Sequence, residues 1–195
     1  LDRQLDVLVR GPRDLPERQQ TMRSAITWSY QLLSDREQAL FRQLSVFAGA
    51  FTLGDVEAVA MPFDREGPSE FSELESLETL ASLVTKSLVQ VGDDSVDPAE
   101  PEYAMLEIIR AFASEQLIEA GDASRLRDRH LTHFVSLSET WTGGLASTRR
   151  DARLAQLDRE YANFRAALSW AAESGQREAG LRLVAALWLY WDWRG

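Results

Sequence analysis

The chain has 195 residues, 45% of them hydrophobic, which is enough to bury roughly 70% of the surface that the unfolded chain exposes. Its formal net charge of −10 argues against a nucleic-acid or acidic-membrane partner for the chain as a whole, because phosphate repels an acidic surface. The absence of cysteine excludes disulfides, thiolate metal sites and a cysteine nucleophile, and it fits a cytoplasmic protein. No apolar run reaches 18 residues, so we expect no membrane-spanning helix.

Residues 1–20 are polar and are interrupted by Gly11-Pro12 and by Pro16, a composition typical of a linker. The chain begins without an initiator Met and stops directly behind a Trp-rich segment. We therefore expect residues 1–20 to be the tail of a preceding helical domain plus a linker, within a longer protein.

Residues 21–60 carry three helical patterns. The first helix is expected to begin at Thr21 and to stop before Ser34; its predicted apolar face consists of Met22, Ala25, Ile26, Ser29, Leu32 and Leu33. Ser34 and Glu37 have the spacing of a capping box for a second helix, whose predicted stripe extends to Phe47 and which Gly49 should end. Thr52 is expected to cap a third helix that reaches Ala60.

Residues 61–121 add a hairpin between two helices. A loop is expected at 62–69, and a fourth helix from Ser69 to Lys86. Short strands are predicted at 88–91 and 103–106, joined by a turn-rich loop, and a fifth helix should run from Glu107 to Ala120. Four helices, a hairpin and a helix in this order are typical of a winged helix-turn-helix whose wing is the hairpin, so residues 21–121 are predicted to form that domain.

Residues 122–195 are predicted to be entirely helical. One helix should run from Asp122 to about Trp141, and Gly143-Gly144 should break it. The next helix carries a strict seam of alternating spacings of three and four residues: Leu154, Leu157, Tyr161, Phe164, Leu168 and Ala171. With the final helix it should form an antiparallel hairpin, the first of a tetratricopeptide-like array. The predicted fold class is therefore mainly α, a winged helix-turn-helix followed by an antiparallel helical-repeat segment.

Catalytic chemistry finds little support in the sequence. No glycine precedes Lys86, the single lysine, so a phosphate-binding loop of the Gly-Lys type is absent. His130 and His133 could ligate a metal, but the chain has no third histidine and no cysteine to complete the site. We expect His130 to end an apolar stripe and His133 to be solvated. Ser34 is better explained as a cap than as a nucleophile. We therefore expect a chain that is not an enzyme and binds no metal.

DNA binding is the main alternative, because winged helices often place the helix before the wing in the major groove. That helix carries Glu70, Glu73, Glu75 and Glu78, and the wing and its flanks carry Asp93, Asp94, Asp97, Glu100 and Glu102. These acids would repel the duplex, so direct nucleic-acid binding by this chain is not expected.

Five segments closely resemble the bacterial STAND-class ATPases, large LuxR-family transcription regulators with an NB-ARC-like nucleotide-binding core. The segments are residues 13–33 (with the pattern R-D-L-P-x-R-Q-x-T and then I-x-W-S-Y-x-L-L), 39–53, 83–89, 103–113 and 157–168. They follow one another in the order expected for that family and extend over nearly the whole chain.

The resemblance implies a nucleotide-binding domain before the winged helix and a helical superhelix after it. It implies ADP or ATP with Mg in the full-length protein, no cofactor in this chain, and a protein or small-molecule inducer. In the NB-ARC relatives the wing leads into a Met-His-Asp motif that contacts the nucleotide phosphates; the matching residues here are Met105, Leu106 and Glu107. Leu106 replaces the histidine and cannot donate a hydrogen bond.

Three functions remain open. The first is a non-catalytic regulatory module of a STAND ATPase, which couples nucleotide state to a helical-repeat sensor. The second is a DNA-binding winged-helix transcription factor with a helical dimerisation tail. The third is a free-standing helical adaptor. The inducer, the target genes and the oligomeric state have no signature in the sequence.

Overall fold

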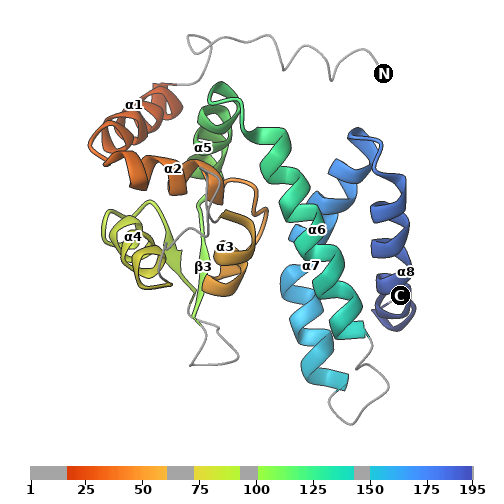
Figure 1. The fold of residues 1–195 in the computed structure, drawn as a ribbon. Helices are drawn as coiled ribbons and strands as arrows, with labels where there is room; N and C mark the ends of the chain where they lie inside the picture. Colours follow the sequence, from red (N-terminus) through yellow and green to blue (C-terminus); the bar gives the residue numbers. More distant parts are fainter. Residues whose placement is uncertain (1–16, 61–72, 93–100, 143–149, 195) are drawn as a thin grey trace.

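The computed structural model describes residues 17–60, 73–92, 101–142 and 150–194, which form a mainly helical protein (Figure 1). A winged helix-turn-helix region with a small antiparallel sheet comes first, and three packed helices follow it, so the predicted fold class is confirmed. Of the tail and linker predicted at 1–20, residues 1–16 lie outside the described residues, whereas residues 17–20 belong to a helix. The predicted loop at 62–69, the wing loop at 93–98 and the break at Gly143-Gly144 also lie outside the described residues. Among the helices described, none combines the length and the apolar character that crossing a membrane requires.

Helix α1 (Glu17–Gln31) begins before the predicted Thr21, and its buried face is rotated from the predicted one and overlaps it only in part. Ile26, Tyr30 and Leu33 are buried, whereas Met22 and Leu32 are 48% and 61% exposed. Tyr30 explains the rotation, because its ring packs against Phe41 and Phe112 and its hydroxyl accepts a hydrogen bond from Arg42. The Tyr30 ring and its hydroxyl thus anchor α1 on the core, whereas the sequence pattern had indicated Leu32 for that role.

Helix α2 (Asp35–Leu44) begins with the predicted capping box. The Ser34 hydroxyl accepts from the Glu37 backbone N–H, and the Glu37 carboxylate accepts from the Ser34 N–H at 2.8 Å. The helix ends at Leu44 and does not continue to Gly49 as predicted, because the N–H groups of Ser45 and Phe47 turn back to carbonyls only three residues before them. Phe47 is nevertheless buried, in the turn that follows.

The sheet has three strands in the order β1-β3-β2. Strands β2 (Gln90–Val91) and β3 (Glu102–Ala104) form the predicted wing, although both are shorter than the sequence indicated. Strand β1 (Phe51–Thr52) was not predicted; it pairs antiparallel with β3, so that Phe51 lies opposite Tyr103. Two residues are too few for a period-two pattern, which is why the sequence did not reveal this strand.

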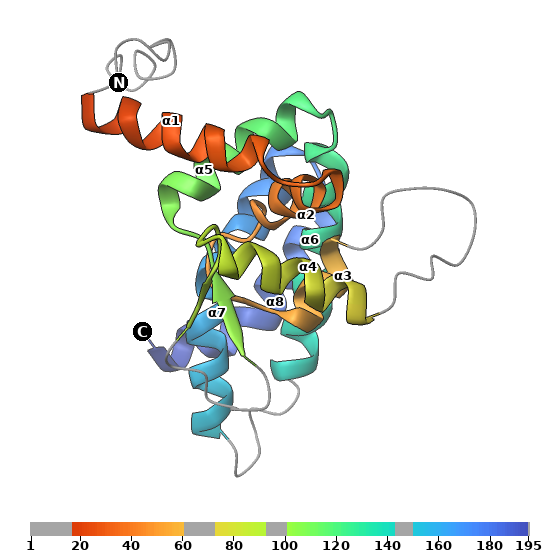
Figure 2. The ribbon, with the colours of Figure 1, turned by 90° about the vertical axis from the view of Figure 1, so that its left-hand side faces the viewer.

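Helices α3 (Leu53–Ala60) and α4 (Glu73–Thr85) pack against α2 and against each other, and α3 also contacts β1; Figure 2 shows both helices below α2. Val56 and Val59 of α3 and Leu80 and Leu83 of α4 are fully buried. The predicted start of this helix at Ser69 lies outside the described residues, and Leu77 on its outer side is 41% exposed. The fold therefore places α4 next to the wing with one apolar face in the core.

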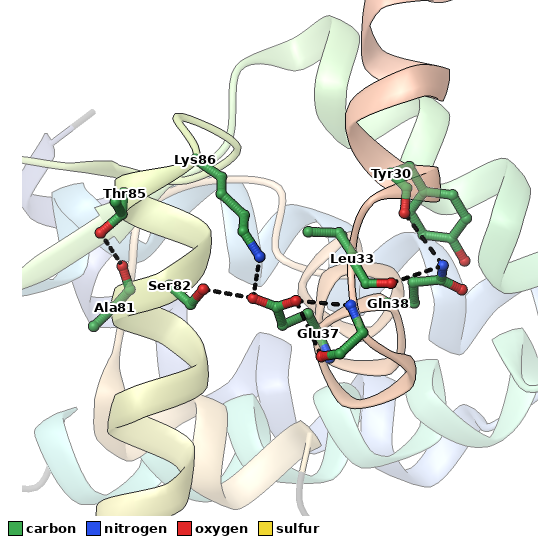
Figure 3. A network of polar contacts seen from close by, with 9 residues as sticks. Tyr30, Leu33, Glu37, Gln38, Ala81, Ser82, Thr85 and Lys86 are labelled. Carbon is green, nitrogen blue, oxygen red and sulfur yellow. Dashed lines mark hydrogen bonds and ion pairs between the residues drawn. The ribbon is translucent and has the colours of Figure 1, made fainter.

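Figure 3 shows the polar contacts that fix α4 on α2. The Glu37 carboxylate accepts hydrogen bonds from the Ser82 hydroxyl at 2.5 Å and from the Lys86 ammonium group. Burial opposes the charged form of Glu37, but the hydrogen bonds from Lys86, Ser82 and Ser34 outweigh burial and lower the pKa of this carboxyl to about 2. One side chain thus completes the α2 cap and ties α4 to it.

The remaining helices are α5 (Glu107–Glu119), α6 (Ala123–Thr142), α7 (Arg150–Glu173) and α8 (Arg177–Arg194). Gly121, with a φ of +79°, ends α5 as predicted, and Gly175, with a φ of +74°, separates α7 from α8. Helices α6, α7 and α8 contact one another and lie side by side (Figure 1). Of the predicted α7 seam, Leu157, Phe164 and Ala171 are buried.

Replacing Glu37 by alanine should lower the free energy of unfolding by about 2–3 kcal/mol, because both the cap and the acceptor for Lys86 and Ser82 are lost. Urea unfolding followed by circular dichroism measures the change. Glu78→Ala, at an exposed position on α4, removes the same charge and serves as the control. Equal losses in the two variants would contradict the role assigned to Glu37.

Candidate functional site

The first candidate surface is α4 together with the wing, the part of a winged helix that contacts DNA in many proteins. Its exposed α4 side chains include Leu77, Glu78, Ala81 and Thr85, which carry no positive charge. Lys86 follows the helix, but its ammonium group is paired with Glu37. The α4 surface described here thus offers a phosphate backbone little attraction.

The wing has the same character. Gln90 and Val91 of β2 are exposed and uncharged. Glu102 of β3 turns toward the helical segment, where Arg159 of α7 pairs with it at 2.8 Å. Asp93, Asp94, Asp97 and Glu100 belong to the segment outside the described residues. Of the acids expected on this surface, Glu78 is exposed, whereas Glu75 pairs with Arg36 and Glu102 pairs with Arg159, so the described surface is less acidic than the sequence predicted.

The second candidate site is the joint between the winged helix and α7, and Asn163 lies at its centre. Asn163 is fully buried. Its side-chain oxygen accepts hydrogen bonds from the backbone N–H groups of Ala48 at 2.8 Å and Gly49 at 3.1 Å, and its amide group donates to the carbonyl of Ala50 at 2.8 Å. One side chain of α7 thus pairs with three consecutive residues of the turn between α2 and β1.

The joint is also closely packed. A Cβ atom on Gly49 would lie 3.2 Å from the Cβ of Ala162, closer than most such contacts, so glycine allows α7 to approach the turn. Phe47 and Phe51, which flank the turn, stack with their ring centroids 4.8 Å apart. Phe134 of α6 packs edge-on against Phe47 and against Phe164 of α7. Aromatic contacts therefore continue from the winged helix into the helical segment.

A second polar contact joins α3 to α6. Thr52 and Asp55 form a reciprocal cap, in which the Thr52 N–H and hydroxyl donate to the Asp55 carboxylate. The His133 ring lies 2.6 Å from the other Asp55 oxygen, so the prediction of a solvated His133 was wrong. Burial opposes the charged form of Asp55, but hydrogen bonds from His133 and Thr52 outweigh burial and lower its pKa.

His130 occupies the interior beside these groups. It is 3% exposed and its ring lies 5.6 Å from that of Phe47 and 4.4 Å from that of Phe134. Burial, assisted by the nearby His133, lowers the pKa of His130 to about 3, so the ring is neutral at pH 7. The described residues contain no group of three or more potential ligands that could hold a metal ion.

Glu160 adds a buried acid to the joint. It lies one turn before Asn163 on α7, and the Asn163 amide donates to its carboxylate at 2.6 Å. Burial raises the pKa of the Glu160 carboxyl to about 8, and the nearby charge of Asp55 contributes to this rise. The joint is therefore formed with a largely protonated Glu160 at neutral pH.

The three residues predicted from the family resemblance lie where β3 leads into α5. Met105 packs on the core, Leu106 precedes α5 and is 46% exposed, and Glu107 occupies the first helical turn. Glu107 pairs with Arg110, one turn further along α5, at 2.7 Å. The structure places the three residues together on one short segment; their contact with a nucleotide stays a prediction.

Sequence reasoning missed Asn163, Glu160 and Asp55, which form the joint. Asp55 and Asn163 each stand next to apolar residues, and Glu160 follows two charged ones, so none of the three stood out as a buried polar group. One signal was available: Asn163 directly precedes the buried Phe164 within the 157–168 segment, and buried amides occur where they pair with other polar groups.

Comparison with known proteins agrees with this geometry. Residues 33–118 match the winged helix-turn-helix domain family. Over 191 residues the chain is 35% identical to "Putative HTH-type transcriptional regulator" Rv0890c of Mycobacterium tuberculosis and to Mb0914c of Mycobacterium bovis, which carries the same name. These alignments cover 98% of this chain and 20% of each relative, so the chain spans about a fifth of their length.

A shorter relative, the uncharacterized protein Rv0894 of Mycobacterium tuberculosis, is 30% identical over 131 residues, which are 67% of this chain and 31% of that protein. No solved structure matches the chain significantly. The chain thus contains a winged helix-turn-helix domain and is homologous to much longer proteins that are named as putative transcriptional regulators.

The free energy of unfolding should fall as pH rises from about 4.5 to about 8. Over this range folded Glu160 keeps a proton that the unfolded chain releases, and the expected slope is about 1 kcal/mol per pH unit. Below and above this range Glu160 has the same protonation state in the folded and unfolded chain, so it should add nothing to the slope. Glu160→Gln, which imitates the protonated acid, should remove this part of the slope.

Urea unfolding at pH 5, 6, 7 and 8 tests the expectation, with the exposed Glu178→Gln as the matched control. If Glu160→Gln followed wild type at every pH, the assignment of a protonated Glu160 would be wrong.

Proposed function

We propose that the chain is a non-catalytic regulatory module of a cytoplasmic transcription regulator, in which the winged helix and the helical segment α6–α8 influence each other through the joint at Asn163. The observation that carries the proposal is the set of three hydrogen bonds from this buried side chain to the turn between α2 and β1. Moving α7 would break these bonds, so the position of the helices is linked to the shape of the winged helix.

Two exposed apolar faces favour a position between other domains. On α1 and in the turn directly after it, Met22, Trp28 and Leu32 are 48%, 65% and 61% exposed. On α8, Leu181, Val184 and Trp188 are 69%, 42% and 56% exposed and share one face at helical spacing. The named relatives are about five times longer than this chain, and an exposed apolar face suits a packing partner. We infer that α1 meets a preceding nucleotide-binding domain and that α8 meets further helical repeats.

The family resemblance supports the finer form of the proposal, a STAND-type ATPase switch. In this form ADP or ATP with Mg binds to the preceding domain, and the segment Met105–Glu107 faces it. Leu106 is exposed but has no polar group, so in our proposal the winged helix covers the nucleotide without donating to its phosphates. An inducer acting on the helical repeats would loosen this cover through α7.

In the full-length protein, Asn163→Ala should accelerate the release of labelled ADP, because the winged helix loses its hold on α7. Arg165→Ala, at an exposed position on the same helix, should release ADP at the wild-type rate. A protein that binds no ADP would end the ATPase form of the proposal. Binding with equal release from all three proteins would contradict coupling through Asn163.

DNA binding by this winged helix is the second candidate. The comparisons favour it more directly than the ATPase form, because the relatives' name states helix-turn-helix regulation of transcription and no name states an ATPase. The name, however, describes proteins of which this chain covers a fifth. The surface of α4 and the wing offers phosphate little attraction, because Lys86 is paired with Glu37, and this argues for contacts with protein instead.

Fluorescence anisotropy with labelled duplex DNA at about 20 mM salt separates the candidates, since binding through phosphate contacts is strongest at low salt. We expect no binding by the 195-residue chain at micromolar concentration. Binding that weakens steeply with added salt, and that Thr85→Glu on the exposed side of α4 abolishes, would establish the second candidate and overturn the first.

A further inference from the structure

A cavity of about 320 Å³ lies between the winged helix and the helical segment, beside the turn that Asn163 holds. Its walls come from the turn after α2, from α5, and from α6 and α7. The volume is at the lower end of the range that small-molecule sites occupy, and such sites are frequent at junctions between domains.

Two arginines line the cavity, and Arg127 gives it a local positive charge, although the whole chain has a net charge of −10. Arg110 of α5 is held by Glu107, which accepts from its Nε at 3.0 Å and from its Nη2 at 2.7 Å. Arg127 of α6 lies over the ring of Trp170, 5.2 Å from the centroid. Among the described residues, no hydrogen bond or ion pair engages the Arg127 guanidinium.

Trp170 is itself fixed in place. Its indole N–H donates to the Asp128 carboxylate at 2.8 Å, and Gln176 donates to the same oxygen at 2.5 Å. The fixed Trp170 ring therefore holds the Arg127 guanidinium in one position, in which it can bind an anion.

The other polar lining groups leave this positive character in place. His130 is neutral at pH 7, and its Nε2 is buried without a hydrogen-bond partner among the described residues. Ser114 adds a hydroxyl group. Glu173 is the acid among the lining residues; it is exposed and accepts a hydrogen bond from Ser169 at 2.9 Å. Glu107 offsets the charge of Arg110, so Arg127 is the lining cation that has no acidic partner among the described residues.

We propose that this cavity binds a small organic anion that carries one carboxylate or phosphate group, with Arg127 as its main charged contact. A guanidinium on an aromatic ring, inside a cavity and without an acidic partner, is best satisfied by a planar or tetrahedral oxyanion. The cavity exists only while α5, α6 and α7 are together, so the ligand stabilises that arrangement. Binding itself does not rest on the regulatory function proposed above; only its consequence for the joint does.

Phenyl phosphate is a suitable probe, and isothermal titration calorimetry on the 195-residue chain measures its binding. We expect saturable binding with a dissociation constant of about 1 mM or tighter, and none with phenol, which has the same ring without the charge. Arg127→Gln should weaken binding at least about tenfold. Arg125→Gln, an exposed neighbour on α6 that pairs with Asp122, loses the same charge and should bind as wild type does.

Ala166→Leu fills the cavity while both arginines remain, so it should also weaken binding, and circular dichroism establishes that each variant is folded. No saturable binding up to about 10 mM, or equal weakening by Arg127→Gln and Arg125→Gln, would overturn the proposal. Either result would leave the ADP-release experiment on the full-length protein unaffected, so the two proposals fail separately.

Discussion

The turn between α2 and β1 depends on a side chain that lies more than a hundred residues away. Asn163 accepts from Ala48 and Gly49 and donates to Ala50, and it is fully buried while doing so. Removing such a side chain would leave buried backbone groups without partners, at a cost of about 1–3 kcal/mol for each group. The position of β1, and with it the three-stranded sheet, is therefore tied to α7.

The same region carries charge with little solvent to screen it. Asp55 keeps its charge through His133 and Thr52, Glu160 gives up its charge through burial, and His130 is neutral. Only some combinations of protonation states are energetically favourable in such a cluster, because each charge acts strongly on its neighbours at low dielectric. A joint that switches between two states would require this sensitivity to the charges around it. The exposed surface of α4 lacks such a cluster, because the nearby Lys86 is already paired with Glu37.

Much of the fold could be predicted from the sequence, because long helices reveal themselves by period and by caps. The Ser34 cap, the end of α5 at Gly121 and the hairpin of the wing are all local features, and all are present. Errors arose where tertiary contacts decide. Tyr30 rotates α1, and β1 is two residues long and exists because β3 pairs with it. The end of α2 also differs, since its last turn tightens before Phe47.

The candidate site was harder to predict for the same reason. Asn163, Asp55 and Glu160 belong to different elements or to the inner face of a helix, and only the packing of α6 and α7 on the winged helix brings them together. The resemblance to a known family directed attention to Met105, Leu106 and Glu107 instead. The last of these turned out to hold Arg110 at the edge of a cavity that no motif indicated.

Native-state hydrogen exchange tests most directly whether the winged helix and the helical segment form one cooperative unit. If they do, the central amides of α3, such as Val56 and Val59, and those of α7, such as Phe164 and Ala167, should open with free energies that agree within about 1 kcal/mol. Opening of α7 at a free energy several kcal/mol below that of α3 would show that the two parts unfold independently. That result would contradict the account, because a joint that transmits a signal must hold both parts together.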